Sequence, residues 1–184
     1  MFPGFLVLGG YPSYAYSSVE YWSAENPEEE SCVLSGYPQS LHNYPTTNFV
    51  SGKLVTCYDY DCEIYNNGVW THLVSTLYKR RYGSSAQTED RILLIGGDYT
   101  SATEWINVDG SASQHGPFSL RHSYHHCTIQ PSSDLIVVTG GYSTPNYVTE
   151  YQLTTGAGRG LAALNQGRYR HACGVYNHAG QQVN

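Results

Sequence analysis

The chain has 184 residues, enough for a well-packed domain, and no apolar run approaches the roughly 20 residues that a membrane-spanning helix needs. Fifteen acidic against nine basic side chains give a formal charge of -6, which disfavours polyanionic partners such as nucleic acids or anionic membranes. Tyrosine supplies 18 positions and glycine 19, a mixture that favours short strands joined by turns. We therefore predict an all-β protein.

The first half of the chain contains two sets of predicted strands, bounded by apolar or β-branched runs. The first set is Phe5–Leu8, Val19–Trp22 and Cys32–Leu34, with an acidic loop at residues 26–30. The second set is Asn48–Val50, the strand through Leu54-Val55-Thr56, Cys62–Ile64 and Trp70–Leu73.

The second half repeats this order. The third set begins at Ser84–Gln87, continues through Ile92–Ile95 and Thr103–Trp105, and ends at Gly116–Phe118. The fourth set is Arg121–Gln130, Leu135–Thr139, Thr149–Tyr151 and Leu161–Leu164, with a loop at Gly156–Gly160, and His171–Tyr176 is predicted to start a further set.

One signature recurs in each set: an apolar strand ends at a pair of residues, usually glycines, and a loop then leads to a strand that contains glutamate and an aromatic or apolar residue. The pairs begin at positions 9, 57, 96 and 140, which are 48, 39 and 44 residues apart. These separations are typical of repeats that each form one small sheet. We predict units at about 1–40, 41–79, 80–120 and 121–167, with the start of a next unit at 168–184.

Four antiparallel strands per unit of this size indicate the blade of a β-propeller. The chain resembles the kelch-repeat family of propellers over nearly its whole length, and it departs from the pattern at Cys57-Tyr58, which replaces a glycine pair. The resemblance is carried by the glycine pairs Gly9-Gly10, Gly96-Gly97 and Gly140-Gly141, by the strand glutamates Glu20, Glu104 and Glu150, by Trp70, and by the arginines Arg81, Arg121 and Arg168.

The recurrent residues have predicted structural roles. A glycine pair at the end of a buried strand permits a positive φ or the close approach of a neighbouring segment. Carboxylates on buried strands must be paired, so Glu20, Glu63, Glu104 and Glu150 are expected to contact backbone donors or arginines such as Arg81, Arg121 or Arg168. Because these glutamates recur once per unit, they do not converge on one catalytic site.

The five cysteines show no zinc-ligand spacing. Cys57 and Cys62 flank a predicted hairpin loop, where they either form a disulfide or remain two buried thiols. Cys127 and Cys173 occupy equivalent positions in successive units, and we expect them to be too far apart to bond. Cysteine content slightly favours an extracellular location.

Histidines near the start of the fourth unit are candidate metal ligands. His122, His125, His126 and His171 could face one mouth of a central channel, but the alternation of side chains along a strand places His125 and His126 on opposite faces. We predict no metal and no cofactor. Galactose oxidase, a copper enzyme, shares the kelch-type fold, yet no copper motif can be matched to this sequence.

The predicted function is recognition of a protein or peptide by loops, with a copper oxidase of the galactose-oxidase type or a carbohydrate-binding propeller as alternatives. Loops between the second and third strands of each unit should emerge on one face. Tyrosine gives contact area at low entropic cost, although these side chains could instead cap the sheets. The candidate binding residues are Tyr11, Tyr14, Tyr16, Tyr58, Tyr60, Tyr99, Tyr142 and Tyr147.

The number of units leaves two arrangements open. The last predicted strand could complete the first unit and close a four-bladed ring, or the chain could form an arc of a larger ring, which the ending at Val183-Asn184 favours. The sequence does not identify the partner or an oligomeric state.

Overall fold

The computed structural model describes residues 4–8, 19–23, 32–33, 45–120 and 126–174, and for the first three of these ranges it describes only the backbone. The described residues form strands and turns and contain no helix, so none of them forms a helix that could cross a membrane. The predicted all-β class is confirmed.

The strands form four antiparallel sheets, in each of which neighbours along the chain are neighbours in space. The first sheet has three strands: β1 (Gly4–Leu8), β2 (Val19–Ser23) and β3 (Cys32–Val33). The second has β4 (Thr46–Val50), β5 (Lys53–Tyr58), β6 (Asp61–Asn66) and β7 (Val69–Ser75). The third has β8 (Ser84–Gln87), β9 (Arg91–Gly97), β10 (Thr100–Asn107) and β11 (Gln114–Ser119). The fourth has β12 (Cys127–Ser132), β13 (Leu135–Thr139), β14 (Val148–Gln152) and β15 (Gly158–Gly160).

The apolar run in β9 is continuous because this strand is buried on both faces. Leu93 and Ile95 pack into a cluster with Ile136 and Val138 of the fourth sheet, whereas Ile92 and Leu94 pack into a cluster shared with the second sheet. Successive side chains of a strand point to opposite faces, so one strand supplies both cores. The third sheet is therefore held between its two neighbours.

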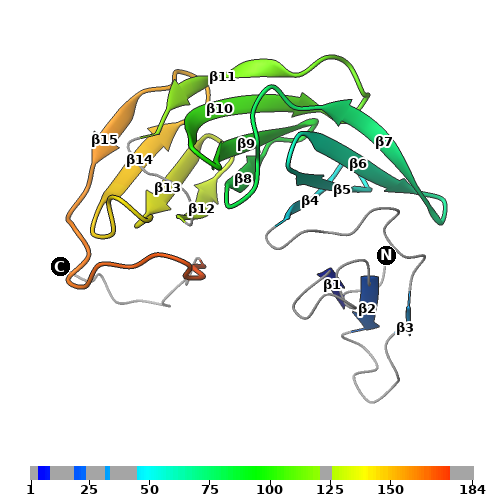
Figure 1. Cartoon of the computed structure of the whole chain (residues 1–184), viewed down its shortest axis with the longest axis horizontal. Coiled ribbons are helices and arrows are strands. Elements are labelled where there is room, and N and C mark those ends of the chain that lie inside the picture. The colour runs from blue at the N-terminus through cyan, green and yellow to red at the C-terminus, as the bar shows by residue number, and fades with distance from the viewer. Residues whose placement is uncertain (1–3, 9–18, 24–31, 34–44, 121–125, 175–184) are drawn as a thin grey trace.

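Polar side chains connect the first strands of the three four-stranded sheets. Ser85 of β8 donates a hydrogen bond to Asn48 of β4 at 3.1 Å, and Ser84 lies 2.5 Å from Thr128 of β12 between their hydroxyl oxygens. The three sheets consequently lie side by side along an arc, and Figure 1 shows that the described strands do not close a ring.

Some predicted boundaries were wrong. The expected loop at Gly156–Gly160 contains β15, because Gly158 pairs with Tyr151 and a Cβ at Gly158 would press on the Tyr151 ring. Leu161–Leu164 is not a strand, although the Leu161 amide still donates to the Val148 carbonyl at 2.9 Å. Residues 171–174 also form no strand, so within the described part of the chain nothing completes the first sheet in the way that four-bladed closure requires.

Candidate functional site

Three loops join the second and third strands of the four-stranded sheets, as predicted. In the second and third sheets each loop has two residues: Asp59 and Tyr60 between β5 and β6, and Asp98 and Tyr99 between β9 and β10. Asp59 has a φ of 39° and Tyr99 a φ of 58°, values that tight hairpin turns require at such positions. The loop between β13 and β14 is longer and spans residues 140–147.

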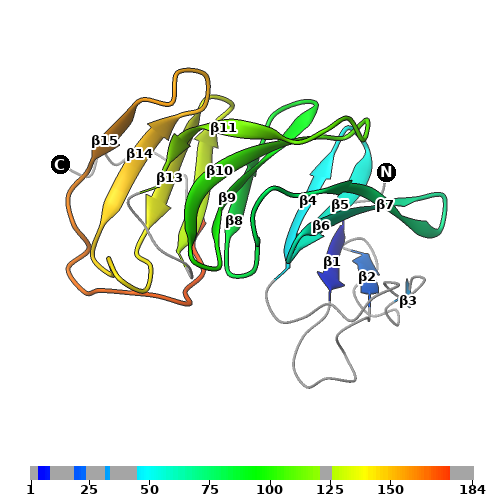
Figure 2. The same cartoon turned by 45° about the horizontal axis from the view of Figure 1, so that its top comes forward.

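The three loops lie at the same end of their sheets (Figure 2), and each carries at least one exposed tyrosine. Tyr99 is 87% exposed, the largest exposed fraction among these tyrosines. Tyr60, Tyr142 and Tyr147 are each more than half exposed. We call the surface formed by Tyr60, Tyr99, Tyr142, Tyr147 and the neighbouring Tyr169 the tyrosine face.

Tyr58 does not belong to this surface, and its prediction as a binding residue was wrong. It is the last residue of β5 and is buried, and its hydroxyl donates to the Glu63 carboxylate at 3.4 Å. A side chain at the end of the strand, before the turn begins, still points into the sheet packing. Tyr11, Tyr14 and Tyr16 lie outside the described residues.

The segment that connects the second and third sheets, residues 76–83, holds two of the loops in place. The amide of Arg80 donates to the Asp59 carbonyl at 2.7 Å, and the amide of Asp98 donates to the Lys79 carbonyl at 3.1 Å. The Lys79 ammonium lies 3.4 Å from the Asp98 carboxylate and 3.8 Å from that of Asp59. The turns of two different sheets are thereby fixed relative to each other.

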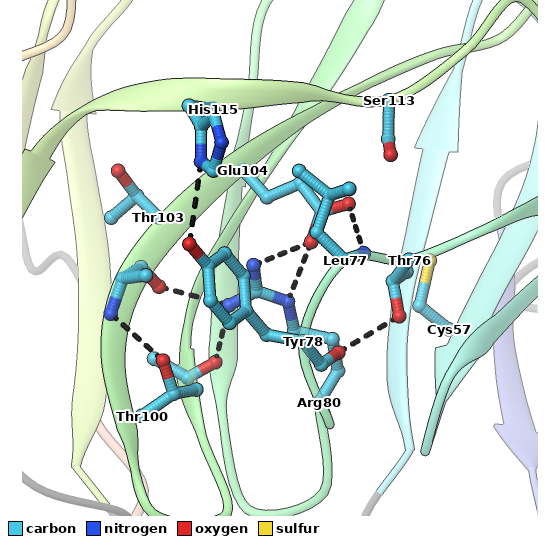
Figure 3. A network of polar contacts seen from close by, with 12 residues as sticks. Cys57, Thr76, Leu77, Tyr78, Arg80, Thr100, Thr103, Glu104, Ser113 and His115 are labelled. Carbon is cyan, nitrogen blue, oxygen red and sulfur yellow. Dashed lines mark hydrogen bonds and ion pairs between the residues drawn. The ribbon is translucent and has the colours of Figure 1, made fainter.

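Beneath these turns, Arg80 and Glu104 form a buried ion pair (Figure 3). Arg80 Nη2 and Nε donate to Glu104 Oε2 at 2.5 and 3.1 Å, and the Leu77 amide donates to the other carboxylate oxygen at 2.8 Å. Arg80 Nη1 also donates to the carbonyls of Gly96 and Ala102. Burial lowers the pKa of Arg80, while Glu104 opposes that shift.

Glu104 and Glu150 contact arginines, and Glu104 also a backbone donor, as predicted, but these arginines are not the ones named from the sequence. Arg80, and not Arg81, pairs with Glu104, whereas Arg81 lies over the Tyr82 ring with its guanidinium carbon 4.7 Å from the ring centroid. Glu150 pairs with Arg159 from the neighbouring strand β15, at 2.9 Å. Arg168 is exposed, and Arg121 and the side chain of Glu20 lie outside the described part. The missed signal is the position of Arg80 just before the tight bend at Tyr82, whose φ is 66°.

The glycine pairs adopt positive φ angles, as predicted: Gly96 and Gly97 have 59° and 155°, and Gly140 and Gly141 have 64° and 120°. A Cβ at Gly97 would overlap the Lys79 carbonyl oxygen, and a Cβ at Gly140 would overlap that of Arg168. These close approaches let each connecting segment lie directly against a tyrosine-bearing loop. Gly9 and Gly10 lie outside the described residues.

The described residues form two disulfides. Of the two alternatives for Cys57 and Cys62, the disulfide is the one present, and both residues are buried at the base of the Tyr60 turn. The expectation that Cys127 and Cys173 are too far apart was wrong, because their Cα atoms are 6.1 Å apart and their sulfurs are bonded. The segment after β15 passes the end of β13, where His171 contacts Thr139, and reaches the start of β12 at Cys127. The repeat pattern gave no sign of this path.

The described residues contain no group of three or more histidine, cysteine or carboxylate side chains placed to hold a metal ion. His126 is buried, and His171 Nε2 lies 2.9 Å from the Thr139 hydroxyl. The pKa of His171 is lowered mainly by burial and to a smaller extent by the positive charge of Arg168. His122 and His125 lie outside the described residues.

No protein-family model matches the chain, and no curated protein matches it. Among solved structures, that of YjhT is similar, with a TM-score of 0.73 and 12% sequence identity. The similarity covers 86% of this chain and 62% of the YjhT chain, so this chain spans less than two thirds of that protein's length. At 12% sequence identity, the similarity shows that this chain and YjhT share a fold.

Proposed function

We propose that the chain is a kelch-type β-propeller region that binds a protein or peptide through the tyrosine face. The propeller arrangement is supported by the repeated meander of four strands, by the side-by-side first strands, and by the glycine pairs next to the connecting segments. A sheet of a propeller buries both faces against its neighbours, and the third sheet does so here.

The observation that carries the functional proposal is the exposure of tyrosines at equivalent loop positions on three neighbouring sheets. Tyr60, Tyr99 and the pair Tyr142 and Tyr147 come from the second, third and fourth sheets respectively. A large aromatic ring exposed to water gains free energy when a partner covers it, and tyrosine has few rotatable bonds to immobilise. Four such rings at one end of a rigid scaffold therefore suit recognition.

The support under these loops limits the entropic cost of binding. Backbone hydrogen bonds join Thr76 to the Tyr60 carbonyl at 2.7 Å and Gly140 to the Tyr147 carbonyl at 2.8 Å. Loops held in this way lose little freedom when a partner binds, so more of the contact energy appears as affinity.

The two disulfides support an oxidising compartment, because thiols are kept reduced in the cytosol of most organisms. We propose an extracellular or otherwise oxidising location on this basis. Expression with and without disulfide formation, followed by a comparison of thermal unfolding, tests whether the fold needs such an environment.

The proposed function is tested by selecting peptides from a random phage-displayed library on the immobilised protein. Peptides that bind through the tyrosine face should lose about tenfold or more in affinity when Tyr99 and Tyr142 are both changed to alanine, as expected for two interface tyrosines. Phe49→Ala is the matched control, because Phe49 is 45% exposed and lies toward the other end of the sheets. Retained affinity in Y99A/Y142A, or a loss of its folded structure, would support a sheet-capping role for these tyrosines.

Carbohydrate binding is the second candidate, and a different feature favours it. A cavity of about 490 Å³ opens between the third and fourth sheets, at the end opposite the tyrosine face. Its walls combine the hydroxyl-bearing Thr88 and Ser133 with Arg91, Trp105 and Leu153. Polar groups beside apolar surface suit a polyhydroxylated ligand. This candidate is tested by titrating monosaccharides into the wild type and Arg91→Ala. The signal is tryptophan fluorescence, to which Trp105 contributes.

A further inference from the structure

We propose that the part of the tyrosine face over the fourth sheet binds an acidic peptide segment, a specificity that rests on the proposed function and names its partner class. The site consists of Tyr142, Tyr147, Arg168, Tyr169 and Arg170, and we call it the basic patch. These residues come from two stretches of chain, the loop between β13 and β14 and the segment after β15.

All five residues of the basic patch are exposed. Tyr142, Tyr147 and Tyr169 are 58%, 53% and 51% exposed, so each ring retains surface for a ligand. The rings of Tyr142 and Tyr169 meet edge to face, with centroids 5.7 Å apart. This contact joins the two stretches into one surface, with the arginines on either side of Tyr169.

The local charge of the basic patch is opposite to that of the whole chain. Residues 138–147 and 160–174 contain two arginines and neither aspartate nor glutamate, although the formal charge of the chain is -6. The nearby carboxylate of Glu150 pairs with Arg159. At the other part of the tyrosine face, by contrast, Asp59 and Asp98 share one lysine. An acidic ligand is therefore directed to the fourth sheet and away from the second and third.

The arginine-bearing segment is fixed before any ligand binds. The amide of Arg168 donates to the Pro145 carbonyl at 2.8 Å, and the Arg168 carbonyl accepts from the amide of Gly141 at 3.0 Å. The disulfide of Cys173 with Cys127 anchors the same segment a few residues later. A guanidinium on a fixed backbone loses less entropy when it forms paired hydrogen bonds with a carboxylate.

These features specify the ligand chemistry. Two guanidinium groups can each donate two parallel hydrogen bonds to a carboxylate, which a single point charge cannot match in geometry. The three tyrosines of the basic patch offer apolar surface for an aromatic or aliphatic side chain. The ligand is thus an extended peptide with at least two carboxylates separated by an apolar residue.

The probe is a fluorescein-labelled peptide of alternating glutamate and tyrosine, with a matched peptide that carries glutamine in place of glutamate. Anisotropy should show that the wild-type protein prefers the glutamate peptide and that R168Q/R170Q weakens its binding by about tenfold or more. K53Q is the control for the single variant R168Q, because each removes one positive charge and Lys53 begins β5, at the end of the sheets opposite the tyrosine face. The affinity of K53Q for the glutamate peptide should stay within about twofold of that of the wild type. Added salt should weaken the binding of the glutamate peptide to the wild type.

Three results would overturn the inference: no binding of the glutamate peptide, equal binding of the glutamine peptide, or equal losses in R168Q and K53Q. The last result would show that overall charge alone attracts the peptide. If the glutamine peptide binds equally well and Y99A/Y142A abolishes its binding, the inference fails while the proposed function stands. If library selection yields no peptide that depends on the tyrosine face, the proposed function fails as well.

Discussion

Arg80 and Glu104 form an ion pair whose two side chains are 1% and 0% exposed, although one lies in a connecting segment and the other in the middle of β10. The pair joins the segment between the second and third sheets to the interior of the third sheet. Because Arg80 also hydrogen-bonds two carbonyls and Glu104 accepts from the Leu77 amide, the whole segment depends on this contact. The position of the tyrosine-bearing turns above it follows from the same arrangement.

Removal of one partner of this pair should strongly destabilise the protein. Glu104→Gln leaves the Arg80 cation buried without its counter-charge, and we expect the free energy of unfolding to fall by about 3–5 kcal/mol. Denaturation by urea, followed by tryptophan fluorescence, measures the change. Arg81→Gln is the control, because Arg81 lies over the Tyr82 ring and forms no ion pair with a described carboxylate, and its loss should cost about 1 kcal/mol or less. Equal losses in the two variants would contradict the assignment.

Gly97 should tolerate no side chain. A Cβ there would overlap the Lys79 carbonyl oxygen, and the φ of 155° is itself unfavourable for other residues, so Gly97→Ala should lower the free energy of unfolding by about 2 kcal/mol or more. Gly160→Ala is the matched control, since a Cβ at Gly160 has no heavy atom within 4 Å. Its effect should stay within about 0.5 kcal/mol. A tolerated Gly97→Ala would show that the connecting segment can move away from the turn.

The repeat signature predicted the all-β class and most strand positions because each strand satisfies a local rule. Ile92–Ile95 is apolar throughout since it is buried on both faces, and the glycines after it adopt angles that other residues avoid. The same local rules located the turns that carry Tyr60 and Tyr99. Cys57 and Cys62 flank a hairpin loop and pair across its two strands, so a disulfide between them was one of the two predicted alternatives.

Features that depend on connections between sheets were not predictable in this way. The choice of Arg80 over Arg81 follows from a bend of the segment at Tyr82, which has no repeat signature. The bond between Cys127 and Cys173 depends on the return of the chain after β15, and Tyr169 is part of the tyrosine face for the same reason. Tyr58 shows the converse limit, because it stands one position before the turn and is buried, whereas Tyr60, two positions later, is exposed.

The disulfide between Cys127 and Cys173 should contribute more to stability than that between Cys57 and Cys62. The first closes a loop with a sequence separation of 46 and the second one of 5, and loop-closure entropy then gives about 4 and about 2 kcal/mol respectively. Thermal unfolding of C127S/C173S and of C57S/C62S, each compared with the wild type, measures the contribution of each disulfide to stability. Mild reductant should open the bond of the exposed Cys173 before that of the buried Cys57. Peptide mapping of alkylated thiols measures the order of reduction. If the bond of Cys57 opened first, this result would contradict the placement of residues 167–174.

Acidification should weaken the fold through His171. Burial and the nearby Arg168 lower the pKa of this histidine in the folded protein, so between that value and the unfolded pKa of about 6.5 the unfolded chain binds more protons. The stability contribution of the neutral ring is therefore complete above about pH 6.5 and declines as the pH falls through this window.

The measurement compares the melting temperatures of wild type and His171→Gln across this pH range. Glutamine has an acceptor and a donor for the Thr139 hydroxyl, which contacts His171 Nε2 at 2.9 Å, and it does not titrate. The melting temperature of His171→Gln should thus rise relative to that of the wild type as the pH decreases. Arg168→Gln should raise the histidine pKa toward its ordinary value, which nuclear magnetic resonance of the ring protons can follow directly, and should narrow the pH window in which stability is lost. Parallel melting curves for wild type and His171→Gln at every pH would show that the ring titrates equally in the folded and unfolded chains.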